Sequence, residues 1–443
     1  MIKKGSLTGL LLFGMFFGAG NLIFPPQLGL ESGQNFWPAI GGFVLSGVGI
    51  AILTLIIGTL NPKGYIDEIS KKIAPWFAVV YLVALYLAIG PFFAIPRTAT
   101  TAFSVGIEPM LPAGSHAIWL FGFTLVYFAF AYLIALNPSK ILDSIGRYLT
   151  PIFALLIVVL VVLGAAKYGS TAPQGATAEY AASAFGAGFL QGYNTLDALA
   201  SVAFSVVAVT TLNQLGFKNK KEYISTIWIV GILVALGFSV LYIGLAFLGN
   251  HFPLNLANLP KGANVGASVL SSATQAIFGP MAQIFLAIMV TVTCFTTTAG
   301  LIVSTGEFFH NTFPKVSYKV YATIFTLVGF AIANLGLNAI IQYSVPALEI
   351  LYPITITIVM IVMVNRFLPL SKPGMQLTIA VVTLIAFASI LGRQFKLTAI
   401  LNLVNALPFA QASLPWLLPA LVGILLSLLL PNKQKSEAFE FEA

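Results

Sequence analysis

The residues that could do chemistry in this chain are polar side chains inside long apolar runs. Asn21 follows two glycines in the first run, and the segment 191–197 places five polar side chains and a glycine in the sixth. Such groups are costly in the middle of a membrane and therefore indicate a site. Amides, hydroxyls and carboxylates can bind an ion or a zwitterion, whereas the sequence places no nucleophile beside a base. The pattern favours binding over catalysis.

The segment Phe16–Pro26 predicts an interruption in the first helix. Its two glycines each cost roughly 1 kcal/mol in a helix interior, and two prolines follow them. If the helix unwinds here, its upstream half leaves carbonyls free near Gly14 and Phe17, which suit a cation. Its downstream half leaves N–H groups free near Ala19 and Gly20, which suit a carboxylate. The alternative is that the glycines only allow close helix packing.

A second interruption is expected at Gln191–Asp197, because this segment is too polar for a lipid-facing helix. Interrupted spans at corresponding places in two halves of a chain indicate a transporter built from inverted repeats, with its site at the midplane. The first and sixth spans would each begin a five-helix repeat, and the odd number inverts the second copy. The substrate-binding residues predicted at the two breaks are Gly18, Ala19, Gly20, Asn21, Gly192, Tyr193 and Asn194.

A row of hydroxyls in the eighth span could hold an alkali cation. By the i, i+3, i+4 rule, one helical face carries Thr293, Thr296, Thr297 and Gly300. Threonine hydroxyls and free carbonyls are hard oxygen ligands. The alternative is that each hydroxyl bonds back to a carbonyl of the preceding turn and only packs.

Three ionisable residues inside spans are candidates for coupling or gating. Asp197 either caps the half-helix that follows it or binds the substrate ammonium or the cation. Glu349 lies well inside the tenth span, as a neutral buried acid, a gate partner or a proton site. Arg97 is expected at the outer end of the third span, where it either extends its charge to the interface or forms part of an outer gate.

The composition shows what must position these residues. Of 443 residues, 58% are hydrophobic and only 8% are charged, whereas soluble proteins carry roughly 25% charged residues. This excludes a soluble multidomain enzyme. The single cysteine, Cys294, excludes a disulfide within the chain. The net charge of +8 is scattered between apolar runs, so nucleic acid is not an expected partner.

The apolar runs predict an all-α polytopic membrane protein. Each run is long enough to cross a bilayer as a helix, which takes about 20 residues, and none shows the period-2 alternation of barrel strands. Twelve spans are predicted, at about 6–29, 38–60, 74–99, 117–136, 147–166, 187–212, 225–249, 279–308, 318–336, 338–364, 375–392 and 414–430.

The basic residues predict the orientation of these spans, because cytoplasmic loops are enriched in Lys and Arg. With the N-terminus inside, the cytoplasmic side holds 16 of the 21 Lys and Arg residues. The other side holds Arg97, Lys167, Lys261, Arg393 and Lys396. We expect a single membrane domain over 1–443 with both termini cytoplasmic. Its first repeat would cover 6–166, its second 187–366, and two further helices 375–430.

Several motifs resemble the bacterial branched-chain amino acid:cation symporters, a family within the amino acid-polyamine-organocation superfamily. The N-terminal motif is long and specific, and the likeness extends over essentially the whole chain. At one position in the sixth span, Leu196, the family commonly has methionine. The segments that carry the resemblance are Lys4–Leu7 with Phe16–Pro26, Gly90–Ala99 and Gly192–Leu199.

The resemblance implies uptake of leucine, isoleucine and valine into a bacterial cell, driven by sodium on a leucine-transporter-like fold. It places the sodium ion between the carbonyls of Gly14, Phe17 and Thr293 and the hydroxyls of Thr296 and Thr297. The substrate carboxylate would meet the amides of Ala19 and Gly20, near Asn21. Na+ is then the coupling ion, no covalent cofactor is expected, and the partners are the amino acid and the lipid bilayer. The alternative is proton-coupled uptake through Glu349 or Asp197.

Overall fold

The computed structural model describes residues 9, 13–14, 16–61, 63–112, 116–136, 140–213, 220–260 and 262–434. The N-terminal motif Lys4–Leu7, most of the first half of span 1, and Lys261 lie outside the described residues.

The described chain is built from helices, with one short pair of antiparallel strands, β1 (Leu370–Ser371) and β2 (Lys433–Gln434). In chain order the helices are α2 (Ala19–Ser32), α3 (Phe36–Val44), α4 (Ile50–Thr59), α5 (Gly64–Lys72), α6 (Pro75–Leu87), α7 (Ala94–Ala102), α8 (Ala117–Leu136), α9 (Lys140–Tyr168), α10 (Ala178–Tyr193), α11 (Asp197–Asn213), α12 (Lys220–His251), α13 (Val265–Phe278), α14 (Ala282–Thr312), α15 (Tyr318–Ala333), α16 (Leu337–Phe367), α17 (Lys372–Gln394), α18 (Thr398–Asn405) and α19 (Leu417–Leu429).

Seven stretches of the described residues are long and apolar enough to cross a membrane. They are Ala19–Thr59, Pro75–Met110, Ala117–Leu136, Lys220–His251, Ala282–Thr312, Leu337–Phe367 and Lys372–Gln394. Shorter apolar helices, such as Tyr318–Ala333 and Leu417–Leu429, supply further candidates. The chain is therefore a polytopic helical membrane protein, and the count of twelve spans stays a prediction.

The third span is longer than predicted. The sequence predicts its end near residue 99, but the helical path continues to Met110. Two wide turns, η3 (Ala88–Phe92) and η4 (Phe103–Ile107), flank α7, and the chain kinks inside η3, where Gly90 before Pro91 is non-helical (φ −93°, ψ −124°). Proline removes a helix hydrogen bond, and a local widening of the helix accommodates that loss. Residues near position 97 consequently lie deeper than their place in the sequence predicts.

The two predicted interruptions are confirmed. Phe17 and Gly18 lie outside any helix, and α2 begins at Ala19. In the sixth span α10 ends at Tyr193, and α11 begins at Asp197. Both breaks are buried, with Phe17 at 0% and Thr195 at 5% exposure, so each leaves free backbone groups within the protein.

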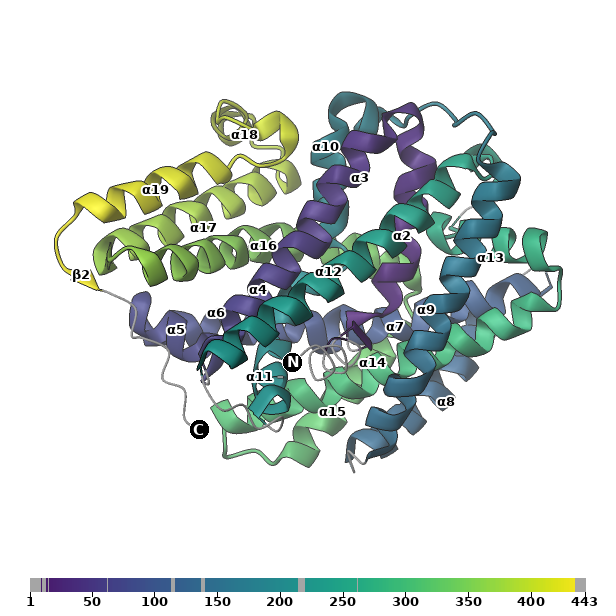
Figure 1. Cartoon of the computed structure of the whole chain (residues 1–443), viewed down its shortest axis with the longest axis horizontal. Coiled ribbons are helices and arrows are strands. Elements are labelled where there is room, and N and C mark those ends of the chain that lie inside the picture. Colours follow the sequence, from purple (N-terminus) through teal and green to yellow (C-terminus); the bar gives the residue numbers. More distant parts are fainter. Residues whose placement is uncertain are drawn as a thin grey trace.

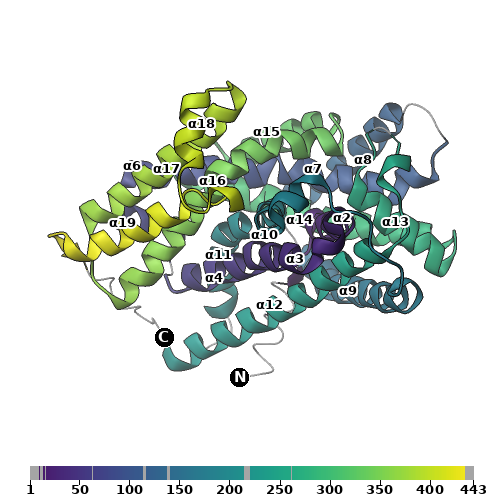
Figure 2. The ribbon, with the colours of Figure 1, turned by 90° about the horizontal axis from the view of Figure 1, so that it is seen from above.

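The packing partners of the two interrupted spans mirror each other. In span 1, α2 packs on α12, whereas α10 and α11 of span 6 pack on α3 and α4. Span 1 thus pairs with span 7, and span 6 with span 2, which is the exchange that inverted repeats produce. These helices cross the middle of the molecule, between the α17–α19 block at one end and α8, α9 and α13 at the other (Figures 1 and 2).

Glycines allow these paired helices to touch backbone to backbone. A Cβ at Gly29 of α2 would clash with the Ala246 carbonyl of α12, and one at Gly249 would clash with Pro26. In the mirrored pair, a Cβ at Gly188 of α10 would clash with the carbonyl of Ala39 in α3. Close packing through small residues is therefore real here. It also occurs between the breaks, where a Cβ at Gly20 would lie 3.1 Å from Thr195 Cα.

Candidate functional site

A small buried cavity lies where the two helix breaks meet. Its volume is about 40 Å³, enough for a few water molecules by the usual measure. It is called the central cavity below. Its lining residues are Phe16, Gly18, Ala19, Gly20, Asn21, Ile89, Ala94, Arg97, Thr98, Thr195, Leu196, Asp197, Ala200, Phe204, Thr297 and Leu301.

The break in span 1 is closed by a side chain of its own helix. Gly18 is extended, with φ −132° and ψ −162°. Its amide donates to Oδ1 of Asn21 at 2.9 Å, so Asn21 accepts the first N–H of the downstream half-helix. The amides of Ala19 and Gly20 come next, and the first amides of a helix lack an intrahelical acceptor. This end of α2 therefore presents donors to the central cavity.

The break in span 6 leaves carbonyls instead. Leu196 has a φ of +67°, a left-handed conformation that costs a non-glycine residue about 1–2 kcal/mol. Thr195 Oγ1 donates to the Gly192 carbonyl at 2.9 Å, and it accepts from the Asp197 amide at 3.3 Å. Strain of this kind persists only where surrounding contacts fix it. The main contact comes from the third span.

Arg97 fixes the second break. Its Nη1 donates to the Asn194 carbonyl at 2.5 Å, and its Nη2 donates to the Thr195 carbonyl at 3.3 Å. The guanidinium lies 5.3 Å from the centre of the Phe24 ring, and the residue is only 3% exposed. The expectation of a side chain at the outer end of span 3 is therefore wrong. The span continues beyond it, and the charge is satisfied inside the protein.

Asp197 joins the two breaks. Its Oδ2 accepts from Asn21 Nδ2 at 3.0 Å and from the Tyr242 hydroxyl at 2.7 Å. Asn21 Nδ2 also contacts the Tyr242 oxygen. Helix capping was one of the two roles predicted for Asp197. Thr195 performs it instead, because its hydroxyl accepts from the Asp197 amide. The carboxylate and the Arg97 guanidinium line the same buried cavity with opposite charges, the arrangement that makes ionisable residues tolerable at this depth.

Of the three threonines, Thr297 lies beside the first break. A Cβ built at Gly18 would be 3.4 Å from Thr297 Oγ1. Thr296 and Thr297 both donate back to the Thr293 carbonyl, at 2.9 and 3.3 Å, so the predicted alternative of local hydroxyl bonding is present. The Thr293 hydroxyl is buried without a partner in the described part of the chain. Only Thr297 of the three lines the central cavity.

The remaining predicted residues lie elsewhere. Gly192 packs against Ser46 in span 2, where a Cβ would clash with its hydroxyl. The Asn194 side chain bonds to Gln191, and only its carbonyl faces Arg97. Tyr193 and Glu349 line a different cavity.

On the cation side, Gly14 and Phe17 are absent from the lining of the central cavity. The Phe17 ring is fully buried and packs against Phe13, Phe153 and Phe238. The helix ends before Phe17, beside the cavity, so the burial of the Phe17 ring does not determine where the Phe17 carbonyl points.

Sequence reasoning missed four polar residues at or next to the site. Tyr242, in an apolar stretch of span 7, supplies a hydroxyl to Asp197. Thr98 and Thr298 hydrogen-bond each other at 2.5 Å, and Tyr127 bonds to Thr298 at 2.8 Å. Thr298 belongs to the same run of threonines as Thr297, so the sequence could have identified it as a candidate site residue. Nothing in the sequence around Tyr242 distinguishes it from the other tyrosines.

The chain has close relatives in sequence. A family model described as branched-chain amino acid transport protein matches residues 1–434. A protein of Staphylococcus haemolyticus named as a branched-chain amino acid carrier is 40% identical over 433 residues, which is 96% of each chain. A carrier of the same description from Staphylococcus aureus is 39% identical over 449 residues, covering 100% of both chains.

Solved transporters share the fold. Mhp1, a nucleobase-cation-symport-1 family transporter in a closed conformation with bromovinylhydantoin bound, aligns with a TM-score of 0.60 at 14% identity, over 98% of this chain and 94% of its own. MhsT, in complex with L-phenylalanine, aligns with a TM-score of 0.56 at 18% identity, over 95% of this chain and 97% of its own. The predicted leucine-transporter-like fold is confirmed.

Proposed function

Since the chain belongs to the family of branched-chain amino acid transport proteins, we propose that it takes up leucine, isoleucine and valine together with sodium by alternating access. Its relatives are named as carriers and its structural neighbours are transporters, so it is not an enzyme. One observation carries the proposal. Two interrupted helices meet at a buried cavity that is lined by a guanidinium, a carboxylate and apolar side chains.

The cavity offers a partner for each end of a zwitterion. The substrate carboxylate would bind the amides of Ala19 and Gly20, where the N-terminus of α2 favours negative charge. The ammonium would bind near Asp197, whose Oδ2 already accepts two hydrogen bonds. The aliphatic side chain would contact Ile89 and Leu301.

Alternating access follows from the size of the cavity. A volume of about 40 Å³ is small for an amino acid, so the spans around it must separate for substrate to enter. We propose that the helix bundle containing both breaks rocks against the remaining helices, with the midplane site as its fixed point.

Sodium would bind between the first break and the eighth span. Thr297 Oγ1 lies beside Gly18, and the upstream half of span 1 ends at Phe16. The last carbonyls of a helix lack intrahelical donors, so they are available to a cation. The predicted ligands are the carbonyls of Gly14, Phe17 and Thr293 and the hydroxyls of Thr296 and Thr297. Thr296 and Thr297 each donate a proton to the Thr293 carbonyl, and each hydroxyl oxygen keeps lone pairs with which it could bind sodium.

Coupling then has a physical basis. The proposed cation ligands and the proposed carboxylate ligands lie on the two sides of one short break, Phe17–Gly18. An ion that orders the upstream carbonyls also orders the downstream amides, so each ligand raises the affinity for the other by the same factor. Leucine affinity in detergent should therefore increase when sodium is added, and an unchanged affinity would contradict direct coupling.

The transport experiment uses proteoliposomes and labelled isoleucine. An inward sodium gradient should drive accumulation above equilibrium, whereas a matched potassium gradient should not. Accumulation under an acid-outside gradient without sodium would transfer the coupling role to a proton. If isoleucine does not accumulate under any of these gradients, the proposed uptake function is contradicted.

Proton coupling is the second candidate, and one observation favours Asp197 as the carrier. Its carboxylate is the direct link between the two breaks, so a change in its charge would act on both. Glu349 lies in another cavity and pairs with Arg393, which makes it the weaker of the two predicted carriers. If protons drive uptake, Asp197→Asn should abolish acid-driven accumulation, while exchange of internal for external isoleucine continues when isoleucine is saturating.

We also propose that both termini face the cytoplasm of a bacterial cell. Because Arg97 is buried, it no longer counts among the outer loop charges. The predicted split of 16 to 5 becomes 16 to 4, which strengthens the asymmetry. Cysteine labelling of the two ends in intact cells would test the orientation.

A further inference from the structure

A second cavity lies beside the sixth span, between α10, α16, α17 and the chain around α18. Its volume is about 130 Å³, against about 40 Å³ for the central cavity. It is called the side cavity below. We propose that the side cavity is a second binding site for a zwitterionic amino acid, with Glu349 for the ammonium and Arg393 for the carboxylate. The inference rests on the proposed function, since it names a further site for the same substrate class.

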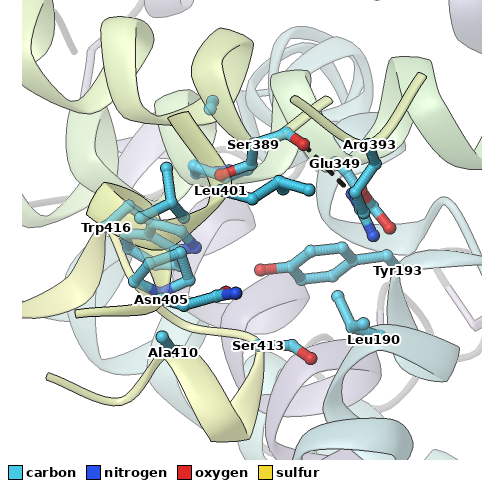
Figure 3. Close-up of a pocket in the computed structure, with 14 residues that line it drawn as sticks. Leu190, Tyr193, Glu349, Ser389, Arg393, Leu401, Asn405, Ala410, Ser413 and Trp416 are labelled. Carbon is cyan, nitrogen blue, oxygen red and sulfur yellow. Dashed lines mark hydrogen bonds and ion pairs between the residues drawn. The ribbon is translucent and has the colours of Figure 1, made fainter. Parts of the chain in front are cut away.

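An ion pair marks the polar end of this cavity (Figure 3). Glu349 of α16 pairs with Arg393 of α17. The Glu349 side chain is 14% exposed, whereas that of Arg393 is 54% exposed. An exposed partner gains little from such a pair, because water can replace the contact. Arg393 can therefore release Glu349 when a ligand brings an ammonium for the acid and a carboxylate for the guanidinium.

A buried hydroxyl borders the same space. Tyr193 is only 2% exposed, and its hydroxyl oxygen interacts with the Trp416 side chain. Figure 3 shows the hydroxyl directed across the cavity toward Asn405 and Trp416. Because an indole N–H can only donate, the proton of the Tyr193 hydroxyl has no acceptor among the described residues. The carboxylate of a bound amino acid would accept it.

The remaining wall is apolar, which suits an aliphatic side chain. Leu190, Leu401 and Val404 line it together with the ring of Trp416. Charged groups at one end and an apolar wall at the other are the two features that recognise a branched-chain amino acid. The central cavity combines charge and apolar surface in the same way.

The side cavity is connected to the transport site through Tyr193. Its ring stacks on Tyr352 with the ring centres 4.1 Å apart. The next residue, Asn194, offers its carbonyl to Arg97 at the second break. A ligand that contacts Tyr193 is thus one residue away from the break. Arg393 and Lys396 belong to the side that the charge distribution predicts to face outward, so the side cavity would take up substrate before the central cavity does.

The test counts bound leucine on the purified full-length protein in detergent with sodium. The wild-type protein should bind two leucine molecules per chain, and Glu349→Gln and Arg393→Gln should each bind one. Lys396→Gln is the matched control, because it removes a positive charge near Arg393 at a residue that does not line the cavity. One leucine per wild-type chain would overturn the second site and leave the proposed function standing, whereas no bound leucine would overturn both.

Two further variants separate binding from folding. Trp416→Phe should abolish any leucine-induced change in tryptophan fluorescence that comes from the side cavity, while uptake through the central site continues. Tyr193→Phe keeps the stacked ring and removes only the hydroxyl, so the weaker of the two leucine affinities should fall about three- to tenfold. Two unchanged affinities in Tyr193→Phe would contradict the assigned role of the hydroxyl.

A lipid headgroup with ammonium and phosphate groups carries the same charges, so lipid is the competing source. Binding should be repeated in nanodiscs of phosphatidylethanolamine and of phosphatidylcholine. Two leucine molecules in both lipids support the amino acid site. A fall to one in phosphatidylethanolamine alone would show that a lipid occupies the cavity and would overturn the proposal.

Discussion

The breaks in spans 1 and 6 differ in how their free backbone groups are satisfied. At the first, Asn21 of the same helix accepts the Gly18 amide. At the second, Arg97 from another span donates to two carbonyls. The first break therefore depends on a neutral, local contact, and the second on a charged contact that crosses the protein. Under the proposed function, the first break is therefore the one expected to reorganise around an ion or a carboxylate, whereas Arg97 holds the second in place.

The two breaks are nevertheless one unit. Asn21 donates to Asp197 at 3.0 Å, and a Cβ at Gly20 would lie 3.1 Å from Thr195 Cα. Movement of one break is consequently transmitted to the other. Four substitutions test this comparison, in order of decreasing expected effect.

Removing the cation from the second break should have the largest effect. Arg97→Ala leaves the carbonyls of Asn194 and Thr195 without their donor and Asp197 without a nearby positive charge. Loss of one partner of a buried charged network costs about 3 kcal/mol, or roughly 100-fold in substrate affinity. Initial uptake rates across isoleucine concentrations would measure it. Arg366→Ala is the control, because Arg366 donates to one carbonyl, that of Leu60, away from the cavity. Equal losses in both variants would contradict a special role for Arg97.

Removing the charge that joins the breaks should come next. Asp197→Asn keeps the shape but turns a charged acceptor into an amide facing the amide of Asn21. Hydrogen bonds to charged groups contribute about 2 kcal/mol, so affinity should fall roughly 30-fold. Asp67→Asn is the matched control. Asp67 lies in α5, where it pairs with Lys71 at 3.1 Å, and although burial tends to raise its pKa, hydrogen bonds from Asn61 and Lys71 lower it overall. Full uptake by Asp197→Asn would show that the link is dispensable.

Adding one methyl group between the breaks should have an intermediate effect. A Cβ at Gly20 would lie 3.2 Å from both Arg97 Nη2 and the Thr195 carbonyl oxygen, so Gly20→Ala must push the two breaks apart. We expect about a tenfold loss of affinity, since overpacking costs about 1–3 kcal/mol. Gly122→Ala should be neutral in the same uptake assay, because no described atom lies within 4 Å of its added Cβ. Unchanged substrate affinity in Gly20→Ala would mean that the two breaks move independently.

The smallest effect is expected at the cation side of the first break. Thr297→Ala removes one of the oxygen ligands that we propose for sodium, so the sodium concentration for half-maximal uptake should rise about fivefold, equivalent to about 1 kcal/mol. Leucine binding at saturating sodium should change less. Thr326→Ala is the control, because that hydroxyl also bonds to the preceding turn but lies in α15. An equal loss of sodium and leucine affinity would place Thr297 in the substrate site instead.

Much of this architecture could be predicted because it depends on local properties. Glycines and polar residues within apolar runs weaken a helix wherever it packs, which is why both breaks were predicted at the right segments. The family motifs were likewise local, and the family is confirmed. The end of span 3 was missed because the chain kinks at Gly90 and then continues as α7 and η4, beyond residues that normally end a helix.

The pairing of the polar groups could not be predicted. Arg97 and Thr195 are 98 residues apart, Asn21 and Asp197 are 176 apart, and Tyr242 lies in a featureless apolar stretch. In the sequence, Glu349 resembles Asp197, since both are acidic residues within a span. In the structure, Glu349 pairs with Arg393 at a different cavity. A buried charge requires a partner, but the sequence alone does not identify which residue supplies that partner.

The sequence by itself determined that this chain enters a membrane, that its helices are interrupted at two corresponding places, and which family it belongs to. These properties follow from composition and from the cost of each residue in a helix. Only the tertiary structure decided that Arg97 closes one break, that Asn21 and Asp197 join the two, and that Glu349 and Tyr193 border a separate cavity. The reason is that apolar helix faces resemble one another, so the contacts between distant polar groups are set by how all the helices pack together.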